Sequence, residues 1–317
     1  MNQLERIYVC VDDTDDLSVT TSTGAVAEMI ARRLYREFDV MINLGITRHQ
    51  LWLDDSVPYT SHNSSLCFDL DMEPGCAAQV NEIGWSVIDS MRAEGSEPGL
   101  CVLPVPMEDG APAAGRINEL RSSLLSYGLK VKSSYMTVEE ALERSSHYPG
   151  MILTGGGQMN QGIVGALAGV ALRLGGHDGE FRGRFDMTAF SDGDCCSADR
   201  CVRMFTRRYR TTPVLADANG APLEGGDRVR LIRDAKAVLR NDRFTILCSP
   251  DSGGVWTPFT KEDLNRHIRR DSCDHFVPDP DEEEHLHDPG NLFCGSCLFR
   301  RLTSGGYICS AGYGPVR

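Results

Sequence analysis

The stretch VCVDDTDD, residues 9–16, joins the end of an apolar run to a concentrated acidic loop. Residues 7–11 are continuously apolar and β-rich, as expected of a strand that is covered on both faces. Ligands of open α/β sheets bind beyond the carboxyl ends of strands, so the loop after this strand is a candidate site. Four carboxylates crowd into five positions there: Asp12, Asp13, Asp15 and Asp16.

The residues after the acidic loop have the spacing of a helix. From about residue 22 to residue 38, Val26, Ile30 and Leu34 recur at helical intervals, and charged residues occupy the other faces. Strand-like and helix-like segments continue to alternate, which indicates a mixed α/β (α+β) fold. Further strands are expected at 41–46, 66–70 and 100–105, and further helices at 77–92, 114–127 and 137–145.

The composition is that of an ordinary globular protein. The 317 residues are enough for two or three domains, and 41% are hydrophobic. A formal net charge of −13 argues against a surface that grips nucleic acid everywhere. The longest apolar run, 162–174, is broken by Arg173 and is too short to cross a bilayer, and the first ten residues lack the pattern of a signal peptide. We therefore expect a cytoplasmic protein with no membrane partner.

Two interpretations of the acidic loop follow from its chemistry. Crowded carboxylates repel one another unless a cation lies among them, and Mg²⁺ takes one or two carboxylates together with waters and substrate phosphates. A helix N-terminus after Ser22 would add N–H groups for the same phosphates. In the alternative interpretation, the loop is a turn with a helix cap, in which Thr20 or Ser22 is the N-cap and Asp15 or Asp16 faces the helix dipole.

A glycine-rich segment, TGGGQMNQG at 154–162, precedes a second small-residue helix. A glycine-rich turn that opens a helix can hold phosphate with its backbone N–H groups, but this segment lacks the lysine of a P-loop. The alternative is that Gly165, Ala166 and Gly169 allow the following helix to pack closely on a neighbour.

The motifs resemble those of the archaeal 2-agmatinylcytidine synthetase family, which modifies the anticodon of an isoleucine tRNA. That family opens with a strand, a D-D-T-D loop, a C-T-T motif and a helix. Four further motifs are similar and follow in the same order, so that the resemblance covers roughly residues 5–221: VPYTSHNSSLCFDL from 57, EPGLCVL at 97–103, QGIVGALAGVALRL at 161–174 and TPVLADANG at 212–220. The opening motifs fall on Asp12, Asp13, Thr14 and Asp15, and on Thr21, Ser22 and Thr23.

The resemblance implies a kinase-like ATP-binding domain at 1–150, a ferredoxin-like domain at 151–224, and a β-rich C-terminal domain at 225–317. It implies that Asp12, Asp13 and Asp15 hold Mg²⁺ and act in catalysis. In the family, a C-T-T threonine takes up phosphate while the tRNA cytidine is activated, and its position is Ser22 here, next to Thr23. The implied ATP-binding residues are Asp12, Asp13, Thr14, Asp15, Thr21, Ser22, Thr60, His62 and Asn63.

The second motif departs from the family pattern. The family's lysine and arginine fall on Thr60 and His62, and its G-N-G becomes the segment that begins at Asn63. Losing two cations beside a triphosphate removes charge stabilisation of phosphoryl transfer. Arg48 and His49, at the end of the preceding strand, are the candidates to replace them.

The C-terminal region carries a candidate zinc site. Twelve cysteines in a chain without an export signal indicate reduced thiols or a metal site rather than disulfides. Cys294 and Cys297 form one C-x-x-C, and a tetrahedral zinc site needs four ligands, for which Cys273 and Cys309 are the preferred additions, followed by His285 and His287. In the alternative, this segment is a turn with free thiols.

Three functions remain open from the sequence. The first is an ATP- and Mg²⁺-dependent, ligase- or kinase-like enzyme that activates a tRNA or a small-molecule acceptor. The second is a non-catalytic nucleotide- or metal-binding protein that retains the fold. The third is a zinc-dependent nucleic-acid-binding module.

Overall fold

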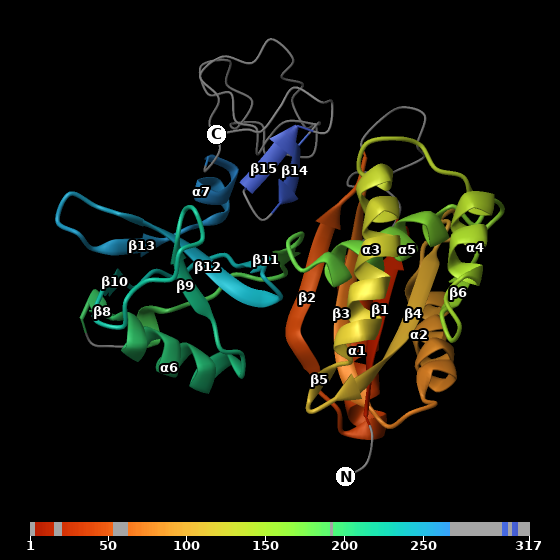
Figure 1. The fold of residues 1–317 in the computed structure, drawn as a ribbon, viewed down its shortest axis with the longest axis horizontal. Coiled ribbons are helices and arrows are strands. Elements are labelled where there is room, and N and C mark those ends of the chain that lie inside the picture. The colour runs from red at the N-terminus through yellow and green to blue at the C-terminus, as the bar shows by residue number, and fades with distance from the viewer. Residues whose placement is uncertain are drawn as a thin grey trace. The chain divides into compact units, whose positions relative to one another are not determined.

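The computed structural model describes residues 4–15, 21–52, 63–190 and 193–264, and, by their backbone alone, 265–266, 300–303 and 306–309. It contains both helices and strands, which confirms the mixed α/β class (Figure 1). The chain divides into two compact units, Met1–Gly175 and Gly176–Arg317. The domain ranges expected from the sequence stay predictions; the helix at Gly162–Gly175, which follows the expected boundary at residue 150, belongs to the first unit.

The first unit is built on a sheet with the order β5-β4-β1-β3-β2, in which β6 also pairs with β4. The central strand β1 runs antiparallel to both β3 and β4, and β3 runs antiparallel to β2. Strands β1 and β2 are therefore parallel, and their carboxyl ends lie at the same edge of the sheet. The strands are β1 (Glu5–Asp12), β2 (Ile42–Gln50), β3 (Ser64–Met72), β4 (Gly99–Glu108), β5 (Ala111–Pro112) and β6 (Ile152–Gly155).

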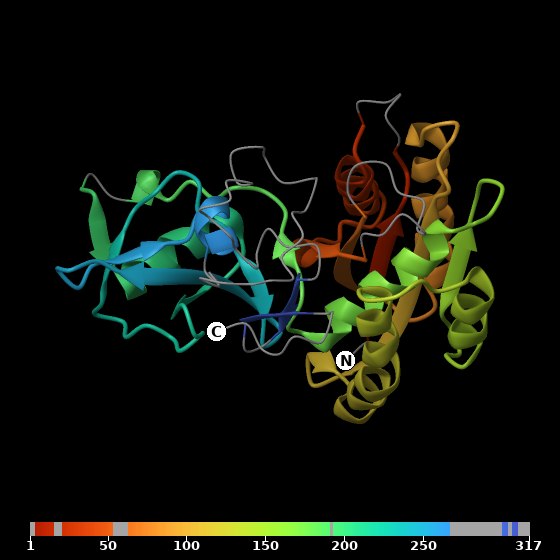
Figure 2. The same cartoon turned by 90° about the horizontal axis from the view of Figure 1, so that it is seen from above.

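Helices cover both faces of this sheet, as Figure 2 shows from above. Ile7, Val9 and Val11 of β1 pack with α1 and α2, whereas Tyr8 and Cys10 point to the core shared with α3, α4 and α5. The predicted strand at residues 7–11 is thus buried on both faces, as expected. The helices are α1 (Thr23–Phe38), α2 (Ala77–Met91), α3 (Ala114–Val131), α4 (Val138–Ser146) and α5 (Gly162–Gly175).

Glycines bring α5 unusually close to the sheet. A Cβ on Gly169 would lie 2.3 Å from Cys10 Sγ and 2.4 Å from Ser65 Oγ, closer than van der Waals contact allows. A Cβ on Gly162 would lie 2.2 Å from the carbonyl oxygen of Glu97. The structure therefore supports the close-packing interpretation of this small-residue helix.

Arg173 ties the apolar helix α5 to β2 and β3. Its side chain is 2% exposed, and it forms a buried ion pair with Asp69, with Nη2 and Oδ1 2.7 Å apart. Nη1 also donates to Thr47 Oγ1 at 2.9 Å and to the carbonyl of Gly45 at 3.1 Å. A charge can be buried in this core because several acceptors surround it.

The second unit contains a sheet with the order β7-β11-β12-β13-β10-β8, in which β9 pairs with β12. Its core includes an aromatic cluster, in which the ring centroids of Phe181 and Phe244 are 4.4 Å apart. Within the described residues, no helix is long and apolar enough to cross a membrane. The elements are β7 (Glu180–Phe181), η1 (Thr188–Phe190), β8 (Cys195–Ser197), α6 (Ala198–Tyr209), β9 (Val214–Asp217), β10 (Arg228–Arg230), β11 (Val238–Arg240), β12 (Arg243–Pro250), β13 (Trp256–Pro258), α7 (Lys261–Arg266), β14 (Arg300–Thr303) and β15 (Gly306–Cys309).

Candidate functional site

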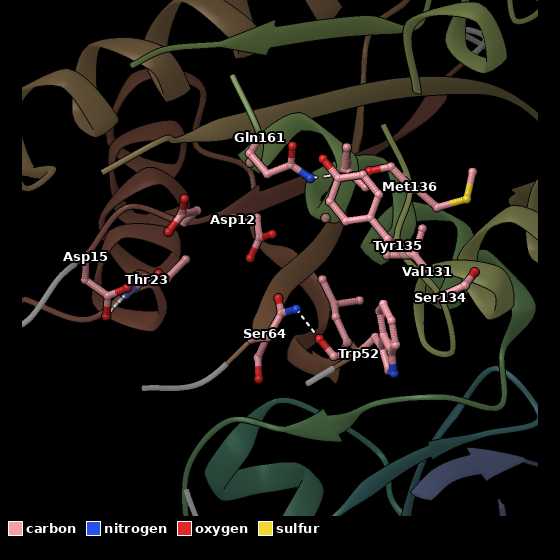
Figure 3. A pocket seen from close by; sticks show the side chains of 16 residues that line it. Asp12, Asp15, Thr23, Trp52, Ser64, Val131, Ser134, Tyr135, Met136 and Gln161 are labelled. Carbon is pink, nitrogen blue, oxygen red and sulfur yellow. Dashed lines mark hydrogen bonds between the residues drawn. The ribbon is translucent and has the colours of Figure 1, made fainter. Parts of the chain in front are cut away.

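A pocket lies in the first unit at the sheet edge where β1 ends. It encloses about 600 Å³, a volume that includes the open solvent at its mouth. In the view of Figure 3, Asp12 and Asp15 lie on one side and Trp52 and Tyr135 on the other. The lining residues are Asp12, Asp13, Asp15, Thr23, Leu51, Trp52, Asn63, Ser64, Val131, Ser134, Tyr135, Met136, Gln161, Gly162, Val164 and Gly165.

Asp12 is the buried member of the acidic loop. It is the last residue of β1, is 7% exposed and belongs to the strand face that packs on α5. Burial raises the pKa of its carboxyl well above the usual range, and the neighbouring charges of Asp13 and Asp15 raise it further. Among the described residues, no lysine or arginine forms an ion pair with Asp12. Its ionised form would therefore be stabilised by a cation in the pocket.

Gly165 makes room for this carboxylate. A Cβ at position 165 would lie 1.7 Å from Asp12 Oδ2 and 2.9 Å from Leu51 Cδ1. Asp12 therefore occupies the space that any side chain of α5 would take at this position. The glycines of α5 therefore let the helix pack closely on the sheet and also leave space for the Asp12 carboxylate.

The start of α1 forms the second side of the acidic region. Ser22 is the N-cap, and its Oγ accepts a hydrogen bond from the N–H of Ala25 at 3.3 Å. The Asp15 carboxylate accepts from the Thr23 hydroxyl at 2.8 Å and from the Thr23 N–H at 3.2 Å. The helix-cap interpretation is therefore correct for Ser22 and Asp15. Asp12 and Asp13 are not part of this cap and line the pocket.

Thr14 and Thr21 contribute less directly. The Thr14 side chain is fully buried and its Oγ1 has no hydrogen-bond partner among the described residues, while its carbonyl accepts from the N–H of Ala93 at 3.0 Å. Thr21 is half-buried. Neither residue is part of the pocket lining, whereas Asn63 is.

The opposite wall of the pocket is apolar and aromatic, and the sequence did not indicate it. Trp52 and Tyr135 lie on this wall, and Tyr135 is 44% exposed. Gln161 lies next to Met136, to whose carbonyl its Nε2 donates at 3.4 Å. These residues come from segments far apart in the chain, so no local spacing could have linked them to the acidic loop.

The glycine-rich segment before α5 already holds an anion of the chain itself. The carboxylate of Glu97 accepts hydrogen bonds from the backbone N–H groups of Gln158, Met159 and Asn160, at 2.8, 2.8 and 2.7 Å. This is the cradle that a phosphate would need. The structure therefore corrects the phosphate-loop interpretation, because Glu97 occupies the cradle.

The structure separates the two cations expected to replace the family's lysine and arginine. His49 is fully buried, and its Nε2 lies 2.8 Å from Thr47 Oγ1. Arg48 is half-buried, and its Nε donates to Ser64 Oγ at 3.0 Å on the pocket wall. Arg48 therefore contacts a residue that lines the pocket.

Several predicted site residues lie outside the described residues: Thr60, His62, Cys273, His285, His287, Cys294 and Cys297. Cys309 lies in β15, which is described by its backbone alone. Within the described part of the chain, no group of three His, Cys, Asp or Glu side chains is arranged to hold a metal ion. The zinc site therefore stays a prediction.

The chain is similar to a small group of solved structures. No protein-family model and no curated protein matches the chain. Three solved structures share 20% identity and a TM-score of 0.42 with it: TiaS in complex with an isoleucine tRNA, AMPCPP and agmatine, TiaS in complex with the same tRNA and ATP, and apo TiaS, described as an agmatidine synthetase of that tRNA. In that order, the matches cover 62%, 65% and 58% of this chain, but only 43%, 45% and 42% of those chains. The chain thus spans less than half the length of these proteins, and its activity has to be inferred from its own site.

Proposed function

We propose that this chain is an MgATP-dependent enzyme that activates an acceptor by phosphoryl transfer. The observation that carries the proposal is the buried Asp12, which lines one pocket together with Asp13 and Asp15 beside the N-terminus of α1. A buried carboxylate without an ion-pair partner in the described chain favours a cation. A helix N-terminus at the same edge favours the anion that such a cation accompanies.

The carboxylates of this pocket suit Mg²⁺ better than a metal ion that takes all of its ligands from the protein. Mg²⁺ is commonly bound by one or two carboxylates together with waters and phosphate oxygens, so three converging protein ligands are not required. Asp12 and Asp13 would hold the ion, and Asn63, which also lines the pocket, would contact the nucleotide. When bound, Mg²⁺ neutralises charge on the phosphates.

Thr23 is better placed than Ser22 to act as a hydroxyl nucleophile. Its hydroxyl donates to Asp15 at 2.8 Å, which is the arrangement in which a carboxylate accepts the proton of an attacking hydroxyl. Ser22 Oγ instead accepts from the helix backbone as an N-cap. We therefore assign the phosphate-accepting role, which the family resemblance suggested for Ser22, to Thr23 first.

The acceptor is a tRNA or a small molecule. The motif resemblance suggests a tRNA. The aromatic wall formed by Trp52 and Tyr135 offers a surface on which a planar ring could stack. The cytoplasmic location, the kinase-like, ferredoxin-like and β-rich domain ranges, and zinc at Cys273, Cys294, Cys297 and Cys309 belong to the same proposal.

A thermal shift experiment tests the nucleotide site. MgATP should raise the melting temperature of the wild-type protein, and Asp12→Asn should abolish that rise. Asp39→Asn is the control, because Asp39 is exposed at the other end of α1 and has a left-handed backbone conformation that asparagine tolerates. No shift of the wild-type protein at millimolar MgATP would reject the proposal.

The alternative is a nucleotide-binding protein without catalysis, which the replacement of two family cations by Thr60 and His62 favours. Mass spectrometry after incubation with MgATP distinguishes the two. A phosphate on Thr23 or Ser22, lost in Thr23→Val or Ser22→Ala, supports the enzyme. Binding of MgATP with neither phosphate nor turnover supports the alternative.

A further inference from the structure

The charged side chains that line the pocket are acidic. Its charged side chains in the described residues are Asp12, Asp13 and Asp15, and no lysine or arginine lines it. One Mg²⁺ would not neutralise these carboxylates and a triphosphate together. Enzymes that transfer phosphoryl groups usually add a lysine or arginine that contacts the terminal phosphates. The proposed triphosphate site therefore needs a lysine or arginine close behind the residues that line the pocket.

The topology of the sheet brings Arg48 to this edge. Because β2 runs parallel to β1, the ends of both strands lie where the pocket opens. Ile46 of β2 belongs to the core on the α1 side, and the two-residue period of a strand places Arg48 and Gln50 on that same side, closer to the edge. The N-terminal residue of α1, Thr23, lines the pocket at this edge.

A small hydrogen-bonded group fixes the guanidinium of Arg48. Its Nε donates to Ser64 Oγ at 3.0 Å, and its Nη2 donates to Gln50 Oε1 at 3.1 Å. Ser64 Oγ donates to the same Gln50 oxygen at 3.2 Å, and Gln50 Nε2 donates to the carbonyl of Asn63 at 3.0 Å. Ser64 and Asn63 both line the pocket. These bonds hold the positive charge directly behind the pocket wall.

We propose that Arg48, oriented by Ser64 and Gln50, binds the terminal phosphates of the nucleotide in this pocket. The inference rests on the proposed function and names the cation that its acidic site lacks. A guanidinium is planar, permanently charged and matches two phosphate oxygens at once, which a lysine does not. His49 does not suit this role, because its ring is fully buried and its Nε2 lies 2.8 Å from Thr47 Oγ1.

Calorimetric titration of the full chain with MgATP, MgADP, AMP and magnesium tripolyphosphate tests the inference. Arg48→Gln should weaken binding of MgATP and magnesium tripolyphosphate about tenfold or more, since a charged hydrogen bond is lost, and should leave AMP binding unchanged. Arg48→Lys should recover part of this affinity. The matched control is Arg33→Gln, because Arg33 is 57% exposed on α1 and pairs with Glu37.

The outcomes separate this inference from the function on which it rests. If the wild-type protein binds neither MgATP nor magnesium tripolyphosphate at millimolar concentration, the proposed function and the role of Arg48 are both rejected. If the wild-type protein binds MgATP and Arg48→Gln binds it equally well, the role of Arg48 alone is rejected. If the circular dichroism spectrum shows that Arg48→Gln is unfolded, Ser64→Ala provides the test in its place. Ser64→Ala removes one of the bonds that orient Arg48 and should weaken MgATP binding severalfold. An unchanged affinity in Ser64→Ala would then overturn the role of Arg48.

Discussion

Replacing Gly165 by alanine should disturb the fold and the site at once. The new Cβ would lie 1.7 Å from Asp12 Oδ2, 2.6 Å from Asp12 Cγ and 2.9 Å from Leu51 Cδ1. Real Cβ contacts essentially never fall below 3.0 Å, so the carboxylate and the helix must separate by about 1.3 Å. Neither can yield easily, because α5 is buried along nearly its whole length and Asp12 ends the central strand.

The expected magnitude follows from two opposing terms. Overpacking a tight core costs about 1–3 kcal/mol, whereas alanine in place of glycine within a helix contributes up to about 1 kcal/mol. Gly115→Ala isolates the second term, because Gly115 is exposed in α3 and its Cβ would meet nothing within 4 Å. Gly165→Ala should therefore be less stable than Gly115→Ala by about 1–3 kcal/mol.

Urea unfolding followed by far-ultraviolet circular dichroism measures this difference, and a thermal shift with MgATP measures the site. Gly165→Ala should lose most of the response to MgATP, because the displaced Asp12 no longer faces the pocket correctly. Gly115→Ala should keep it. If Gly165→Ala matches Gly115→Ala both in stability and in its response to MgATP, the close approach of α5 to Asp12 is wrong.

Three further changes test the packing around the site and in the second unit. Glu180→Gln should cost about 3 kcal/mol at pH 7, because Lys261 and Lys236 hold the pKa of the Glu180 carboxyl at about 2 against burial. This stability is present above the ordinary pKa of a glutamate and is lost as the pH falls toward 2, so urea unfolding at pH 3 should show roughly half the difference. Glu97→Gln should cost about 1–3 kcal/mol and speed hydrogen exchange in the loop that it holds. Arg173→Met should cost about 3 kcal/mol in urea unfolding, since the buried Asp69 loses its partner at 2.7 Å and keeps the more distant Arg6 at 3.5 Å.

Each of these three predictions has an outcome that contradicts it. An equal cost of Glu180→Gln at pH 7 and pH 3 would show that the carboxyl is not held ionised by its lysines. Unchanged exchange in Glu97→Gln would mean that the loop does not depend on the carboxylate. For Arg173→Met, addition of Asp69→Asn should recover part of the loss, and a purely additive double variant would argue against the ion pair.

The elements of the first unit were predictable because their signals are local. The strand predicted at residues 7–11 is β1, and the helix predicted from residue 22 is α1, with Ser22 as its cap. Burial on both faces follows directly from the unbroken apolar run. The acidic residues could be placed at a strand end for the same reason, although nothing in the local sequence shows which of them is buried.

The features that the sequence concealed depend on residues distant in the chain. Glu97 fills the glycine-rich cradle from more than sixty positions away, so a local pattern indicated a phosphate loop that the fold does not leave open. Arg173 looked like an interruption of an apolar run, but it joins α5 to Asp69 across the core. The aromatic wall with Trp52 and Tyr135 likewise exists only after folding.

The most direct test of the central claim is a calorimetric titration of the full chain with ATP, in the presence of Mg²⁺ and in the presence of EDTA. The wild-type protein should bind ATP only with Mg²⁺, and Asp12→Asn should lose this binding. The apo form of Asp12→Asn should be no less stable than wild type at neutral pH, because burial disfavours the charge that the substitution removes. Absence of binding at millimolar MgATP, or equal affinity in Asp12→Asn, would contradict the account.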